Sequence, residues 1–129
     1  MTETVNELNT KQGPQPWPVA KLGELAPGDR KLVEIKRHSI GLFNVNGEYI
    51  AALNMCPHEL APVCKGRVGG TTLPSKPGEF IWGREGEILA CPWHGWEFDL
   101  LTGQMLADDR VRIRRYPVTI EGDDIYITV

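Results

Sequence analysis

The sequence lacks any run of apolar residues long enough to cross a bilayer. A membrane-spanning helix needs about 20 consecutive, mostly apolar residues, and the apolar segments here are interrupted by polar or charged side chains. The segment ahead of Trp17 also lacks the apolar stretch and the paired arginines of a secretory signal. We therefore expect no membrane span, a cytoplasmic location, and a loosely ordered, flexible N-terminal tail over residues 1–16.

The chain also lacks a strong charge of either sign. Its 14 Lys and Arg residues nearly balance 17 Asp and Glu residues, for a formal net charge of −3. No basic stretch could follow a phosphate backbone, which argues against nucleic acid as a partner. A length of 129 residues predicts one domain, over residues 17–129, with a single modest core.

Cysteine and histidine are scarce, with three of each, yet four of these six residues lie in two short clusters. The clusters are Cys56-Pro57-His58 and Cys91-Pro92-Trp93-His94. Two thiolates and two imidazoles suit a tetrahedral zinc ion or a two-iron cluster with histidines on one iron. Zinc fingers usually place a cysteine pair before a histidine pair. Here each cluster is mixed and the two lie far apart, which favours the iron cluster.

The residues around these ligands carry a family resemblance. The segments 56–62, Cys-Pro-His-Glu-Leu-Ala-Pro, and 91–103, Cys-Pro-Trp-His-Gly-Trp-Glu-Phe-Asp-Leu-Leu-Thr-Gly, strongly resemble the Rieske [2Fe–2S] ferredoxins. The resemblance runs from about Trp17 to the C-terminus. It implies an all-β fold, an antiparallel β sandwich or small barrel with a two-loop cluster-binding subdomain, and one [2Fe–2S] cluster per chain.

The same resemblance implies the ligand set and a direction for the reduction potential. Cys56 and Cys91 would hold one iron, and His58 and His94 the other, where neutral imidazoles raise the potential. High-potential Rieske proteins have an extra cysteine, which forms a disulfide, and two hydroxyl donors in the second loop. This chain has Trp93, Trp96 and Phe98 at those positions, so we expect no disulfide and a potential in the lower part of the Rieske range.

The pattern of short apolar segments predicts strands and no convincing helix. The Asn46-Gly47 pair predicts a hairpin turn, and the turn residues of Gly83–Gly86 predict a second hairpin. The stretch from Lys65 to Gly78 shows no regular periodicity and is predicted to be a long loop. The predicted strands are Trp17–Val19, Lys31–Ile35, Ile40–Val45, Glu48–Leu53, Glu79–Trp82, Glu87–Ala90, Val111–Tyr116 and Asp124–Val129.

Several other residues allow two interpretations. Cys64 is interpreted as a small, partly buried apolar residue or an idle thiol. Trp82, Trp93 and Trp96 are predicted mainly to pack in the core and shield the cluster, although Trp93 could line a docking face. Arg112 and Arg114 share one face of a predicted strand and are expected to be solvated. The loop 65–78 could be a surface insertion, or it could cover the cluster or specify a partner.

Two functions from different classes fit these features. The first is a single-electron carrier that passes electrons from a flavin-type reductase to an oxygenase or other terminal oxidoreductase. The alternative is a small non-catalytic subunit of a nitrite-reductase-like complex with an assembly role. An oxygenase would need a mononuclear iron site with two histidines and a carboxylate, and His38 is the one histidine left over. We therefore expect no catalytic site in the chain itself.

Overall fold

The computed structural model describes residues 13–57, 61–73, 77–78, 81–93 and 95–129. These residues form β-strands and one short 3-10 helix, as the all-β prediction requires. In chain order the elements are β1 (Pro16–Lys21), β2 (Arg30–Ile35), β3 (His38–Val45), β4 (Glu48–Leu53), η2 (Val63–Lys65), β5 (Arg67–Leu73), β6 (Ile81–Ala90), β7 (Glu97–Asp99), β8 (Arg115–Tyr116), β9 (Val118–Glu121) and β10 (Asp124–Thr128).

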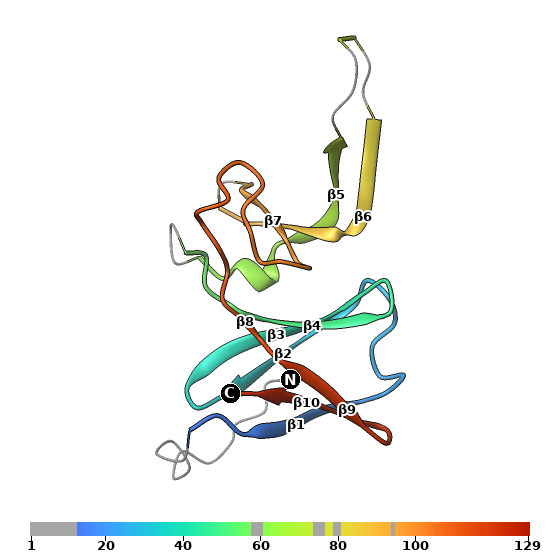
Figure 1. Cartoon of the computed structure of the whole chain (residues 1–129), viewed down its shortest axis with the longest axis vertical. Helices are drawn as coiled ribbons and strands as arrows, with labels where there is room; N and C mark the ends of the chain where they lie inside the picture. The colour runs from blue at the N-terminus through green and yellow to red at the C-terminus, as the bar shows by residue number, and fades with distance from the viewer. Residues whose placement is uncertain (1–12, 58–60, 74–76, 79–80, 94) are drawn as a thin grey trace.

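The strands form three antiparallel sheets in two parts of the molecule. The base contains a sheet of order β1-β10-β9 and a sheet of order β2-β3-β4-β8. The third sheet, of order β5-β6-β7, lies above the base together with η2, and the far end of its β5–β6 pair projects away from the body (Figure 1). We call this third sheet, η2 and the loops beside them the upper subdomain, and the projecting pair the β5–β6 arm.

Strand β3 explains how one sheet supports both parts. All six of its residues from Ile40 to Val45 are buried, because the strand has a core on each face. Ile40 and Leu42 pack into the base core against the β1-β10-β9 sheet, whereas Phe43 and Val45 pack into the core of the upper subdomain. Side chains alternate between faces along a strand, so a continuous apolar run is what a strand between two cores needs.

The predicted hairpin between β3 and β4 is confirmed. Val45 pairs with Glu48, and the two turn residues between them, Asn46 and Gly47, have φ angles of 51° and 98°. A two-residue turn of this kind requires left-handed backbone at both positions, which asparagine and glycine adopt at least cost. The turn directs β4 back toward the upper subdomain, where the first ligand loop begins.

The predicted loop from Lys65 to Gly78 is wrong over much of its length. Arg67–Leu73 forms strand β5, which pairs with β6. The predicted turn Gly83–Gly86 is also wrong, because β6 continues through it as one strand. Gly69 pairs with Ile88, whereas Thr71 pairs with Gly83. The extra residues of β6 between these two pairs, which include the predicted turn, form a large bulge within the strand.

Three smaller differences lie in the second half of the chain. The strand predicted over Val111–Tyr116 is limited to Arg115–Tyr116, whereas the preceding residues contribute an isolated bridge, Gln104↔Arg112. The short strands β7 and β9 were not predicted. Strand β10 confirms the predicted C-terminal strand, which pairs with β1 and β9.

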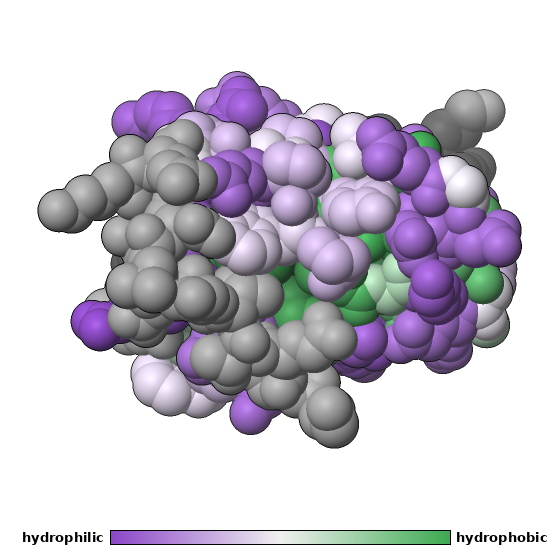
Figure 2. Space-filling view, turned by 90° about the horizontal axis from the view of Figure 1, so that it is seen from below, coloured by the Kyte–Doolittle hydropathy of each residue, from purple (hydrophilic) through white to green (hydrophobic). Residues whose placement is uncertain are grey.

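The base end of the molecule is largely hydrophilic at its surface. Figure 2 shows polar side chains around a narrow band of apolar ones, as expected where two small sheets enclose a core between them. None of the described residues forms a helix with the length and apolarity that a bilayer span requires.

Candidate metal centre

The two predicted ligand cysteines begin loops of the same construction. Strand β4 ends three residues before Cys56, and β6 ends directly before Cys91. In the first loop the Cys56 N–H donates to the carbonyl oxygen of Ala61 at 2.8 Å, and in the second the Cys91 N–H donates to that of Trp96 at 2.8 Å. Each cysteine therefore closes a segment of equal length with one backbone hydrogen bond, so the two loops begin in an equivalent way.

Both cysteine side chains are directed into one core. Cys56 is 1% exposed and Cys91 is 3% exposed, and both belong to the buried cluster that contains Phe98. Neither cysteine forms a disulfide. Two buried thiols on facing loops suit a metal that binds thiolates, because ligation removes the need to bury a free charge.

The predicted histidine ligands His58 and His94 lie outside the described residues, so their assignment stays a prediction. The residue after His94 is Gly95, which has a φ of 69° and donates its N–H to the Cys91 carbonyl at 2.9 Å. This left-handed glycine tightens the second loop at the position next to the predicted ligand.

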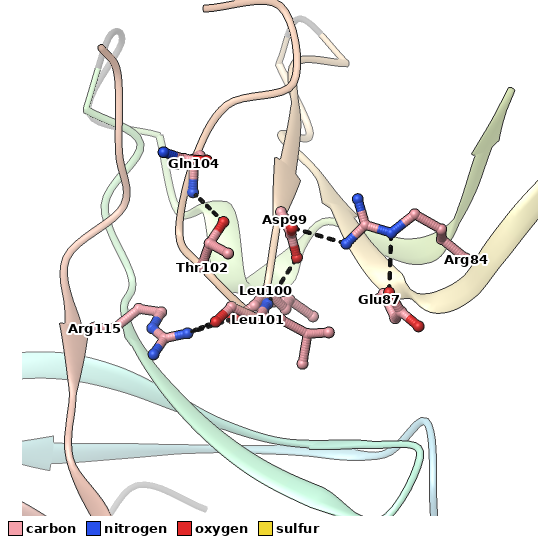
Figure 3. A network of polar contacts seen from close by, with 8 residues as sticks. All are labelled: Arg84, Glu87, Asp99, Leu100, Leu101, Thr102, Gln104 and Arg115. Carbon is pink, nitrogen blue, oxygen red and sulfur yellow. Dashed lines mark hydrogen bonds and ion pairs between the residues drawn. The ribbon is translucent and has the colours of Figure 1, made fainter. Parts of the chain in front are cut away.

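Two arginines from the base hold the segments that follow the loops. Arg30 of β2 donates to the carbonyl oxygens of Cys64 and Gly66, beyond the first loop. Arg115 of β8 donates to the Leu100 and Leu101 carbonyls beyond the second loop (Figure 3). Hydrogen bonds from a charged donor are the stronger kind. Sequence reasoning missed both arginines, because no local pattern indicates that an arginine will reach a distant backbone carbonyl.

Cys64 is not part of the candidate site. It is fully buried beside η2, and its thiol donates to the Ala52 carbonyl at 3.5 Å. Burial raises the pKa of the Cys64 thiol to about 12, despite the opposing effect of a hydrogen bond to Gly41 and the charge of Arg30. The thiol therefore stays protonated at neutral pH, and Cys64 is more completely buried than the partly buried apolar residue that the sequence predicts.

The three tryptophans around the second loop in the sequence differ in environment. Trp96 is partly buried against the core of the upper subdomain, as predicted. The packing role predicted for Trp82 and Trp93 is wrong, because these side chains are 56% and 60% exposed. Arg112 and Arg114 are exposed, as expected for a solvated edge.

An open groove of about 620 Å³ adjoins the second loop. Gly95, Trp96 and Glu97 line it from the second loop and β7, Thr71 lines it from β5, and Leu106 contributes an exposed apolar side chain. The Thr71 hydroxyl lies 3.1 Å from the Glu97 carboxylate. The groove thus places apolar surface and one carboxylate beside Gly95, the residue that follows the predicted ligand His94 in the sequence.

Comparison with known proteins identifies the family. The model of the Rieske [2Fe–2S] domain matches residues 15–117. The chain belongs to the Rieske [2Fe–2S] family. The ferredoxin component of the naphthalene 1,2-dioxygenase system of Pseudomonas aeruginosa is 35% identical over 107 residues, which cover 82% of this chain and 88% of that protein.

Solved Rieske structures share the fold at lower identity. A protein described as an NADH-dependent nitrite reductase small subunit from Mycobacterium tuberculosis superimposes with a TM-score of 0.68 at 22% identity, covering 90% of this chain and 96% of its own. A chain from the complex of reduced oxygenase and oxidised ferredoxin in carbazole 1,9a-dioxygenase gives 0.66 at 20% identity, covering 87% and 91%. Both show the Rieske fold.

As a Rieske protein, the chain carries one [2Fe–2S] cluster. The described part of the site fits this group. Two buried cysteines, each at the start of a loop closed by the same backbone hydrogen bond, could supply the two thiolates that one iron requires. The cluster supplies reversible one-electron chemistry, and its potential depends on charge, hydrogen bonds to sulfur and burial.

Phe98→Tyr tests how the surroundings of the cysteines tune that potential. Phe98 is fully buried in the same cluster as Cys56 and Cys91, and it offers no O–H donor. We expect a wild-type potential at or below about 0 mV near neutral pH, in the lower half of the family range of roughly −150 to +300 mV. A tyrosine hydroxyl at this position would favour the reduced, more negative state and raise the potential by tens of millivolts.

Protein-film voltammetry of the wild type and the variant measures both quantities. Phe98→Leu is the matched control, because it alters packing without adding a donor and should not raise the potential. A wild-type potential above about +200 mV would show that backbone donors or burial affect the potential more than the two hydroxyl donors that Trp96 and Phe98 replace.

Proposed function

We propose that this Rieske protein is a freestanding single-electron carrier that receives electrons from a flavin-type reductase and delivers them to an oxygenase. The observation that carries the proposal is the pair of cysteine loops, in which buried thiols are close in sequence to exposed apolar side chains. Such a site can shield a redox centre and still let a partner protein approach it. The ferredoxin component of a naphthalene dioxygenase system, 35% identical to this chain, supports an oxygenase as the acceptor.

Two exposed apolar side chains lie close to the two cysteines in the sequence. Met55, which precedes Cys56, is 44% exposed, and Trp93, two residues after Cys91, is 60% exposed. Aromatic residues and methionine are enriched in protein interfaces, where a few anchors supply most of the binding energy. We therefore assign Met55 and Trp93 to the docking face for redox partners, beside the groove at Gly95 and Trp96.

The alternative role, an assembly subunit of a nitrite-reductase-like complex, has less support. The structural likeness to a nitrite reductase small subunit is at 22% identity and shows the shared fold. A relative at 35% identity, covered over 88% of its length, is a ferredoxin component. A cytoplasmic location remains our expectation.

The test uses dithionite-reduced holoprotein and horse-heart cytochrome c as a defined one-electron acceptor in stopped flow. We expect reversible uptake of one electron per cluster and fast bimolecular oxidation by cytochrome c. Trp93→Ala should slow that reaction about fivefold, the effect of losing about 1 kcal/mol of interface energy, with the potential unchanged.

Trp82→Ala is the matched control, because Trp82 is equally exposed but lies on the β5–β6 arm. Its rate should equal that of the wild type. A cluster that cannot be cycled between its two states without loss would contradict the carrier function. Equal rates for the Trp93 and wild-type proteins would contradict the assigned docking face.

A further inference from the structure

The bulge in β6 directs one side chain toward the second ligand loop. Residues between Gly83 and Ile88 face the single residue Gly70 of β5. Within the bulge, Arg84 has a φ of 57° and Gly86 has a φ of 85°. Left-handed backbone is unfavourable for a non-glycine residue, and such strain often occurs where a side chain is placed for a function. The contacts of Arg84 show what this conformation achieves.

Arg84 joins two carboxylates from different strands. Its Nη2 lies 2.7 Å from Asp99 Oδ2 on β7, and its Nε lies 3.0 Å from Glu87 Oε1 on β6 (Figure 3). The Asp99 and Glu87 carboxylates raise the pKa of Arg84 above its ordinary value. The Asp99 side chain is 12% exposed and the Arg84 side chain 33% exposed, so the Asp99 carboxylate is the better shielded partner of the pair.

Asp99 in turn organises the turn after β7. Its Oδ1 accepts the Leu101 N–H at 2.9 Å, and its backbone carbonyl accepts the N–H groups of Thr102 and Gly103. The Asp99 N–H donates to the Gln104 carbonyl at 2.8 Å. Asp99 therefore forms four hydrogen bonds with backbone groups of this turn. Its other carboxylate oxygen, Oδ2, pairs with Arg84.

Strand β7 connects Asp99 to the second ligand loop over a very short distance in sequence. Trp96, whose carbonyl closes that loop onto Cys91, directly precedes β7, and Phe98 packs in the core with Cys91. A rotation of the Asp99 carboxylate would therefore shift the strand that frames Cys91. We propose that Arg84 is a positioning residue for the second cluster loop, acting through Asp99, and that it thereby helps to determine the reduction potential.

This inference rests on the proposed assignment of Cys91 as a ligand and not on the identity of any redox partner. Two other roles must be separated from it. Arg84 could act as a bare positive charge near the cluster, or it could stabilise the fold without affecting the cluster. A double-mutant cycle with Asp99 separates both roles from positioning.

The experiment measures the reduction potential and the EPR g-values of holoprotein for Arg84→Gln, Arg84→Lys, Asp99→Asn and the two double variants. We expect Arg84→Gln to shift the potential by a tenfold change in the ratio of oxidised to reduced protein, about 59 mV for one electron. Arg84→Lys keeps the charge but cannot bridge both carboxylates as guanidinium does, so it should give a smaller shift. In the Asp99→Asn background neither substitution should change the potential further.

The matched control is Arg110→Gln. Arg110 forms a comparable pair with Asp108, with its Nε 3.0 Å from Oδ1, but its side chain is 85% exposed. This variant should leave the potential and the g-values unchanged. If Arg84→Gln fails to fold, the cycle with Arg84→Lys decides the question.

Each outcome bears on one hypothesis. An Arg84 effect that persists in the Asp99→Asn background would show direct charge and overturn the positioning role. Unchanged potentials and g-values in Arg84 variants that retain a full cluster would overturn it as well. Absence of a [2Fe–2S] cluster from wild-type protein would instead overturn the proposed site, which keeps the two failures distinct.

Discussion

Serine in place of Cys56 or Cys91 is expected to abolish stable assembly of the [2Fe–2S] cluster. Both thiols are buried in one core and begin loops closed by equivalent hydrogen bonds. A hydroxyl is a poor ligand for iron in such clusters, which require thiolate. Wild-type protein should be red-brown, with two irons and two sulfides per chain and a low average g-value on reduction, whereas both variants should be colourless.

Cys64→Ser is the matched control for these variants. Cys64 is equally buried, but its thiol stays protonated because burial raises its pKa to about 12. The spectrum and potential of this variant should remain close to those of the wild type. Loss of the cluster in Cys64→Ser, or stoichiometric zinc in wild-type protein from iron-replete cells, would refute the ligand assignment.

Gly66→Ala is expected to destabilise the protein severely. A Cβ atom at Gly66 would lie 1.8 Å from the carbonyl oxygen of Ala90, the residue directly before Cys91. The two backbone segments would have to move apart. One contains the Gly66 carbonyl to which Arg30 donates, and the other leads directly into the second ligand loop. Overpacking of this kind costs about 3 kcal/mol or more. We expect the thermal midpoint of the holoprotein to fall by more than about 10 °C and the cluster to be lost faster.

Gly69→Ala on the same strand provides the control. A Cβ there would meet the side-chain ends of Arg67 and Glu85 at 3.7 Å, which is ordinary contact. The free energy of unfolding of this variant should lie within about 0.5 kcal/mol of the wild-type value. For both variants, far-UV circular dichroism measures the thermal midpoint of the fold and visible absorbance measures the rate of cluster loss. Similar midpoints for the Gly66 and Gly69 variants would contradict the close approach of Gly66 to Ala90.

The errors in the predicted strands share one physical cause. The predicted loop 65–78 contains β5, whose Gly69-Gly70-Thr71 segment has no alternation of apolar side chains and is extended because it pairs with β6. The predicted turn Gly83–Gly86 does contain turn-forming backbone, as Arg84 and Gly86 show. Its partner strand keeps it within β6 as a bulge. Pairing between distant segments therefore overrode the local signals.

The sequence by itself determined the family, the all-β class, the cluster and the hairpin at Asn46-Gly47. These features depend on residue type at close spacing: ligand chemistry within two short clusters, period-two burial, and left-handed turn residues. The tertiary structure alone decided that Cys56 and Cys91 share one core, that Arg30 and Arg115 hold the segments after the loops, and that Arg84 reaches Asp99. Those contacts join residues far apart in the chain, and their geometry exists only after the sheets have paired and packed.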